Sequence, residues 1–246
     1  MTLDLTAFWA ALDAVPAAAD AERLYDVAAA DHGNPTERGG PTERGGPTDR
    51  DGPTEGDAGA ERDGTADRGE LAAGALRRAN LDRYLQRFAP AADTILVAEA
   101  PGWRGMSNTG VPFTSMRELQ DPDGLFADLP FAVPEAPTAP WEASSRVVHA
   151  ALRGWHGPLP VLWAVFPHHP FAAPDPLTNR TPRPAEVRAG APVALALADA
   201  VGARRFVAVG RKAQGALAAA GIEAIAVRHP AQGGAAQFTA QLAALR

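Results

Sequence analysis

Two patterns of apolar residues recur along the second part of the chain, and each predicts a different kind of element. Four short apolar runs, at 94–98, 159–165, 205–209 and 223–227, are typical of strands buried on both faces. The segments at 144–155, 184–202, 212–221 and 235–246 repeat their apolar residues at helical spacing. This alternation predicts an α/β fold, a three-layer α/β/α sandwich around a four-stranded parallel sheet.

The first part of the chain has a helical pattern that is interrupted by a segment of another composition. Apolar residues recur at helical spacing over 5–15, 20–31 and 71–88, where Leu81, Tyr84, Leu85 and Phe88 share one face. Between them, residues 35–69 repeat about every six positions and are rich in Gly, Pro, Thr and charge. Such a composition cannot form a core, so we expect a disordered insert within one domain spanning 1–246.

Composition and charge narrow the class of protein. The sequence contains no run of about 18 apolar residues and opens with an acidic segment, so we expect neither a membrane span nor a secretory signal, and a cytoplasmic protein. The chain has no cysteine, which excludes disulfides and cysteine-ligated clusters. The net charge of −6 lies entirely within residues 31–70, which hold 11 acidic and 5 basic side chains. The remainder is neutral, so a nucleic-acid partner is compatible with the charge.

The residues that follow the four predicted strands are the candidates for a binding site, because open parallel sheets bind ligands at the carboxyl ends of their strands. These segments contain AEAPG at 98–102, GVPF at 110–113, NRTP at 179–182, VAVGRKA at 207–213 and RHPAQGG at 228–234. Gly, Pro, His, Glu and aromatic residues thus meet at one edge, which predicts a pocket with a few polar groups in an apolar wall.

In order and spacing, these fragments resemble the motifs of uracil-DNA glycosylases, and most closely the branch whose first motif is GEAPG. The resemblance covers residues 94 to about 240. It implies a monomeric enzyme that needs no cofactor and acts on DNA containing uracil or a related deaminated base. Such enzymes rotate the base out of the duplex before water cleaves its bond to the sugar.

The resemblance also implies roles for individual residues. Glu99 would position the water, Phe113 would stack on the base, and His229 would donate a hydrogen bond to the leaving base. The further residues expected to bind the base are Ala98, Ala100, Pro101, Gly102, Trp163, Ala164 and His168. Those expected to face DNA are Asn179, Arg211, Lys212, Arg228, Ala231, Gln232 and Gly233.

Purely structural roles remain open as alternatives for several of these residues. Glu99 is also compatible with a capping role in its loop, Phe113 with a place in the core, and His229 with a contact that holds a turn. Arg211 and Lys212 are equally compatible with an ordinary solvated helix start. The pair His168 and His169 lacks a third ligand at a suitable spacing, so we expect no metal.

Three departures from the family's pattern bear on activity. The cysteines that hold an iron–sulfur cluster in the GEAPG branch are missing. Ala164 stands where many members carry an asparagine that reads uracil, and Ala231 replaces a serine of the last motif. The sequence therefore leaves two alternatives: a non-catalytic nucleic-acid or base-binding protein on the same fold, and a hydrolase of free nucleosides or nucleotides.

Overall fold

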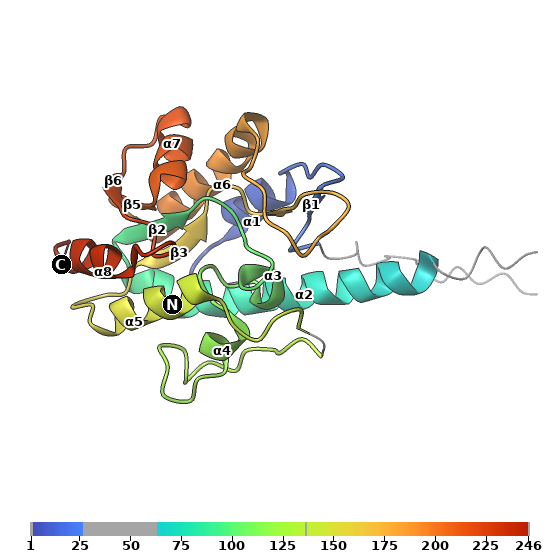
Figure 1. Cartoon of the computed structure of the whole chain (residues 1–246), viewed down its shortest axis with the longest axis horizontal. Helices are drawn as coiled ribbons and strands as arrows, with labels where there is room; N and C mark the ends of the chain where they lie inside the picture. The colour runs from blue at the N-terminus through green and yellow to red at the C-terminus, as the bar shows by residue number, and fades with distance from the viewer. Residues whose placement is uncertain (1, 27–62, 136, 246) are drawn as a thin grey trace, which may run out of the picture.

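The centre of the molecule is a four-stranded parallel sheet (Figure 1). The computed structural model describes residues 2–26, 63–135 and 137–245. The strands are β2 (Thr94–Ala98), β3 (Val161–Ala164), β5 (Arg205–Val209) and β6 (Ile225–Val227), in the order β3-β2-β5-β6. Every neighbouring pair is parallel, and the middle of β2 is fully buried. The four strands predicted from apolar runs are confirmed.

Helices cover both faces of this sheet and complete the three-layer α/β/α sandwich, which is also confirmed. One layer contains α1 (Thr6–Asp13), α6 (Pro184–Val201) and α7 (Arg211–Ala219) (Figure 1). The other contains α2 (Asp63–Phe88), α5 (Ala143–Arg153) and α8 (Ala235–Ala243). Helix α6 packs so closely on the sheet that a Cβ at Gly190 would lie 2.1 Å from the carbonyl oxygen of Val165.

The prediction of a helix over 20–31 is wrong for residues 20–26, the part of this range that the structure describes. Ala21–Glu22 forms β1, which pairs antiparallel with β4 (His169–Pro170). Tyr25 is buried, and its hydroxyl donates a hydrogen bond to the carbonyl oxygen of Gly110 at 2.7 Å. Pairing with a distant segment thus overrides the weak local preference for a helix.

Helix α2 begins at Asp63 and so takes in the last residues of the segment that we expect to be a disordered insert. The rest of that segment, 35–62, lies outside the described residues. The face predicted for α2 is confirmed, because Leu81, Tyr84, Leu85 and Phe88 are all buried. The Tyr84 hydroxyl accepts a hydrogen bond from the backbone N–H of Leu162 in β3 at 2.6 Å.

Three short helical turns that the apolar pattern did not predict complete the fold: η1 (Ala89–Ala91), α3 (Met106–Thr109) and α4 (Met116–Leu119). They lie between the end of α2 and the start of α5, and α3 follows the loop that leaves β2. Among the described residues, no helix is both long and apolar enough to cross a membrane.

Candidate active site

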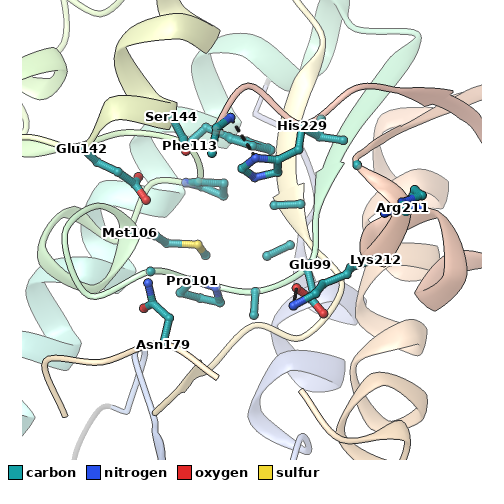
Figure 2. Close-up of a pocket in the computed structure, with 18 of the residues that line it drawn as sticks. Glu99, Pro101, Met106, Phe113, Glu142, Ser144, Asn179, Arg211, Lys212 and His229 are labelled. Carbon is teal, nitrogen blue, oxygen red and sulfur yellow. Dashed lines mark hydrogen bonds and ion pairs between the residues drawn. The ribbon is translucent and has the colours of Figure 1, made fainter. Parts of the chain in front are cut away.

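The carboxyl ends of all four parallel strands open into one pocket of about 460 Å³ (Figure 2). Its size is typical of small-molecule sites. Most of the residues that the sequence predicted for the site line this pocket. They are Ala98, Glu99, Ala100, Pro101, Gly102, Phe113, Ala164, Asn179, Arg211, Lys212, Arg228, His229, Ala231 and Gln232.

Glu99 directly follows β2, and its side chain is 24% exposed in the pocket. Its carboxylate oxygen Oε2 lies 3.8 Å from Nζ of Lys212, which comes from the first turn of α7. Partial burial raises the pKa of Glu99, and the Lys212 ammonium opposes that rise. The pair therefore places a carboxylate at the strand end with a cation that favours its ionised form.

His229 follows β6 and projects into the pocket (Figure 2). Burial lowers its pKa, and the charges of Arg228 and Lys212 lower it further, so the ring is neutral at pH 7. The backbone N–H of Ala231 donates to His229 Nδ1 at 3.1 Å. A neutral ring whose Nδ1 accepts carries its proton on Nε2, so His229 offers one N–H donor to the pocket.

Gly210 explains how the turn after β5 approaches this histidine. Its φ is +89°, in the region that favours glycine, and a Cβ there would lie 2.9 Å from the Cβ of His229. Any other residue at position 210 would displace the histidine.

Phe113 lines the pocket in a strained backbone conformation, with φ at +54°. This conformation is uncommon for a bulky residue and costs on the order of 1–3 kcal/mol. Hydrogen bonds within the turn hold it in place: the Thr109 hydroxyl donates to the Thr114 carbonyl oxygen at 2.8 Å and accepts from Val111 N at 3.1 Å. These hydrogen bonds therefore hold the turn that places the Phe113 side chain at the pocket wall.

The loop after His229 forms another side of the pocket. Gln232 has a φ of +53°, the second non-glycine residue of the described chain with a positive φ. Ala231 and Gln232 line the pocket, whereas Gly233 does not. Arg211, Lys212 and Arg228 are exposed and also line the pocket, and Lys212 donates a hydrogen bond to the Thr181 hydroxyl.

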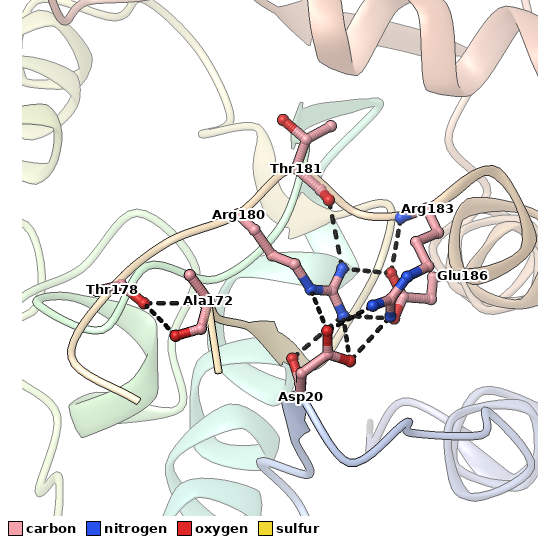
Figure 3. Close-up of polar contacts among 7 residues, drawn as sticks. All are labelled: Asp20, Ala172, Thr178, Arg180, Thr181, Arg183 and Glu186. Carbon is pink, nitrogen blue, oxygen red and sulfur yellow. Dashed lines mark hydrogen bonds and ion pairs between the residues drawn. The ribbon is translucent and has the colours of Figure 1, made fainter. Parts of the chain in front are cut away.

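The NRTP segment closes the pocket from the loop that precedes α6. Asn179 Oδ1 accepts a hydrogen bond from Trp103 N at 3.2 Å. Arg180 pairs with Asp20 at 3.0 Å and with Glu186 at 2.7 Å (Figure 3). Ion pairs to the amino-terminal segment and to α6 thus anchor the loop that carries Asn179.

Two further predicted site residues, besides Gly233, lie away from the pocket. Trp163 precedes Ala164 in β3, and because side chains alternate along a strand it points to the other face. There it is fully buried, with its ring 5.1 Å from that of Phe8. His168 is also buried, and its Nε2 lies 3.1 Å from the carbonyl oxygen of Val15. Both side chains belong to the packed interior.

The pocket also contains residues for which the sequence predicted no role, four of them within the motifs quoted above. These are Met106, Pro112, Glu142, Ser144, Arg180, Val209 and Gly210. Glu142 and Ser144 come from the start of α5, which precedes β3 and does not follow a strand of the sheet. Glu142 and Ser144 therefore lie outside the segments that directly follow strands.

No group of three or more His, Cys, Asp or Glu residues that could hold a metal ion occurs in the described ranges. The polar groups of the pocket are instead two carboxylates, one neutral histidine, amide and hydroxyl groups, and the cations at its rim. This set is suited to proton transfer and to the stabilisation of charge in an organic substrate.

Comparison with known proteins gives a likeness to solved structures and no family. No family model and no curated protein matches the chain. The crystal structure of wild-type Pedobacter heparinus SMUG2 is similar to the chain, with a TM-score of 0.45 and 15% sequence identity. The match covers 67% of this chain and 83% of that one. Likeness at this level does not assign the chain to a family.

Proposed function

We propose that this protein hydrolyses the N-glycosidic bond of uracil, or of a related deaminated base, in DNA, with water as the nucleophile. One observation carries the proposal. A half-buried carboxylate, Glu99, and a neutral histidine donor, His229, share a pocket with an aromatic side chain, Phe113, that the backbone fixes in its wall.

Each of the three residues has a part in the reaction. The flipped base stacks on Phe113 while Glu99 orients a water molecule and accepts its proton. The water oxygen bonds to the sugar carbon as the carbon–nitrogen bond breaks, and the electron pair of that bond moves to the base. His229 donates its Nε2–H to the base as negative charge develops there, when a preorganised donor has its largest effect.

The surroundings of the pocket suit a duplex partner. Arg211, Lys212 and Arg228 lie around its opening, where they would contact phosphates. Gln232 is the long side chain of the loop after His229 and would fill the space that the flipped base leaves. We propose that the protein acts as a monomer and without a cofactor.

A specific observation favours a rival function. Ala164 lines the pocket, and its methyl group offers no hydrogen bond to a base. A protein that binds DNA or a flipped base without cleaving it would tolerate this alanine. A hydrolase of free nucleosides would have no use for the basic rim, whereas a hydrolase of free nucleotides could bind the substrate phosphate there.

The deciding experiment treats labelled duplexes that contain one uracil, hypoxanthine or xanthine with the protein and then with alkali. We expect strand scission at one or more of these bases, reduced at least 100-fold in Glu99→Ala and His229→Ala, the scale of a lost acid–base group. Glu223→Ala, which removes an exposed carboxylate outside the pocket, is the matched control. Binding without scission would favour the non-catalytic rival. Hydrolysis of free deoxyuridine or its nucleotide that competing duplex DNA does not inhibit, without strand scission, would favour the hydrolase of free nucleosides or nucleotides.

A further inference from the structure

Glu142 places a carboxyl group in the pocket that the proposed reaction does not use. The residue immediately precedes α5, and its side chain points into the cavity from the side opposite Glu99 and Lys212 (Figure 2). Two carboxylates thus face one pocket, and only one of them has a cation within 4.0 Å among the described residues.

The neighbouring loop is built to accommodate this carboxyl group. A Cβ at Gly102 would lie 3.0 Å from Glu142 Oε1, and a Cβ at Gly105 would lie 2.4 Å from Oε2. The hydroxyl of Ser145 donates to Oε2 at 2.8 Å. Oε2 therefore accepts one hydrogen bond from the protein and keeps a second acceptor position, whereas Oε1 has no hydrogen-bond partner among the described residues, so both oxygens can contact a ligand.

The side-chain amide of Asn179 lies near the same glycine, Gly102. The same Cβ position at Gly102 is 3.8 Å from both Nδ2 and Oδ1 of Asn179. Asn179 Oδ1 accepts a hydrogen bond from Trp103 N, so the donor group of this amide, Nδ2, has no hydrogen-bond partner among the described residues. Glu142 and Asn179 thus form one polar wall, while β2 and β3 present Ala98 and Ala164 to the pocket.

The surroundings of Glu142 favour its neutral form more than water does. Loss of solvation raises its pKa, the hydrogen bond from Ser145 opposes the rise, and the nearby Glu118 carboxylate adds to it. Arg104, on the loop after β2, again opposes it. A neutral carboxyl group carries an O–H donor next to a carbonyl acceptor.

We propose that Glu142 is the residue that reads the hydrogen-bonding edge of the flipped base, in place of the amide that Ala164 lacks. The ligand would be a base with a lactam edge, a C=O beside an N–H, as in uracil and hypoxanthine. A carboxyl group and a lactam form two parallel hydrogen bonds, with O–H donating to C=O and N–H donating to the carboxyl oxygen. This inference depends on the proposed function, since it assumes a flipped base in the pocket.

Binding tests the inference without requiring cleavage. The probes are two duplexes that each contain one 2′-fluoro-2′-deoxynucleotide, in which the fluorine makes the N-glycosidic bond resistant to hydrolysis. One carries normal uracil, and the other carries N3-methyluracil, which lacks the lactam N–H. We expect the native protein to bind the normal base about 5- to 100-fold more tightly, the range for one two-hydrogen-bond contact to a base. Glu142→Ala should lose this preference.

The amide variant separates base reading from a merely structural role. Glu142→Gln keeps a donor and an acceptor, so it should retain the preference for uracil. It cannot ionise, so its preference should stay constant with pH, whereas the preference of the native protein should decline as pH rises and Glu142 loses its proton. Glu223→Gln, the same change at an exposed site outside the pocket, should behave as native.

The outcomes keep this inference apart from the proposed function. A uracil preference that persists in Glu142→Ala, or an unchanged pH dependence in Glu142→Gln, would overturn the role of Glu142. Absence of strand scission together with a preference lost in Glu142→Ala would support base reading and reject the hydrolase. If Glu142→Ala does not fold, as judged by circular dichroism, the pH dependence in Glu142→Gln decides.

Discussion

Among single residues, the pair of Glu99 and Lys212 links charge to the proposed activity. Partial burial raises the pKa of Glu99 above its ordinary value, and Lys212 at 3.8 Å offsets part of this rise. If Glu99 must be ionised to accept a proton from water, kcat/KM falls as pH drops through this pKa. In Lys212→Gln the opposing charge is gone, so we expect the acid limb of the profile to move to higher pH, measured with a uracil-containing duplex.

Two comparisons make this result specific to charge. Lys212→Arg keeps the cation, so its acid limb should stay near the native position even if DNA binding weakens. Arg211→Gln removes a neighbouring pocket cation that forms no ion pair with Glu99 among the described residues. An acid limb that stays in place in Lys212→Gln would show that Glu99 does not titrate in the step that limits kcat/KM.

The sequence predicted residues in the site best where they directly follow a strand. Strand topology brings the segments after β2 and β6 to one edge, and the resemblance of their motifs pointed to Glu99 and His229 within them. Trp163 was misplaced because the predicted run did not fix which face of β3 each residue occupies, and the pleat directs Ala164 to the pocket instead. Glu142 was missed because its helix reaches the pocket through tertiary packing, which no local pattern encodes.

At the scale of whole elements, the same substitution, glycine to alanine, should have opposite effects on stability in helices α6 and α7. A Cβ at Gly190 in α6 would meet the Val165 carbonyl oxygen at 2.1 Å, whereas one at Gly215 in α7 would meet nothing within 4 Å. Gly190→Ala should therefore lower the free energy of unfolding by about 1–3 kcal/mol, the cost of overpacking. Gly215→Ala should raise it by about 0.5–1 kcal/mol, because alanine loses less backbone entropy in a helix.

Urea denaturation followed by circular dichroism measures both free energies under the same conditions. Equal effects at the two positions would contradict the close approach of α6 to the end of β3. A destabilised Gly215→Ala would show that α7 has a neighbour at that point.

The sequence predicted the long and regular elements and did not predict the very short ones. Helix α6 was recognised across Pro192 because its apolar spacing continues on both sides of the proline. Strands β1 and β4 have two residues each and exist because they pair with each other across a large sequence separation. The turns α3 and α4 have four residues each, too few to show a helical period.

Across the whole molecule, a cluster of ion pairs connects the amino-terminal segment to the loop that carries Asn179. Asp20 lies next to β1 and contacts Arg180 at 3.0 Å and Arg183 at 2.8 Å (Figure 3). These contacts, the hydrogen bond from Arg183 first, hold the pKa of Asp20 far below its usual range, although loss of solvation opposes them. Burial alone would raise the pKa of Glu186, but its hydrogen bonds with Arg180 and with Arg183 N lower it.

The lowered pKa values determine how stability depends on pH. A carboxyl group whose pKa is depressed in the folded state stabilises the protein fully above its unfolded pKa, about 4 for aspartate, and loses that contribution as pH falls towards the folded value. Asp20→Asn removes the contribution at every pH. We therefore expect a lower Tm for Asp20→Asn at pH 7 and a difference from native that shrinks below about pH 4, measured by thermal unfolding.

Asp128→Asn provides the matched control, because Asp128 pairs with Arg87 at 3.3 Å and both side chains are more than half exposed. Exposed pairs of this kind contribute about 0–1 kcal/mol, so its Tm should stay close to native at all pH values. If Asp20→Asn melts like Asp128→Asn at pH 7, the cluster does not hold the two segments together. If instead Asp20→Asn loses stability and also binds DNA more weakly than Asp128→Asn below both melting temperatures, the anchoring of the Asn179 loop extends to the pocket.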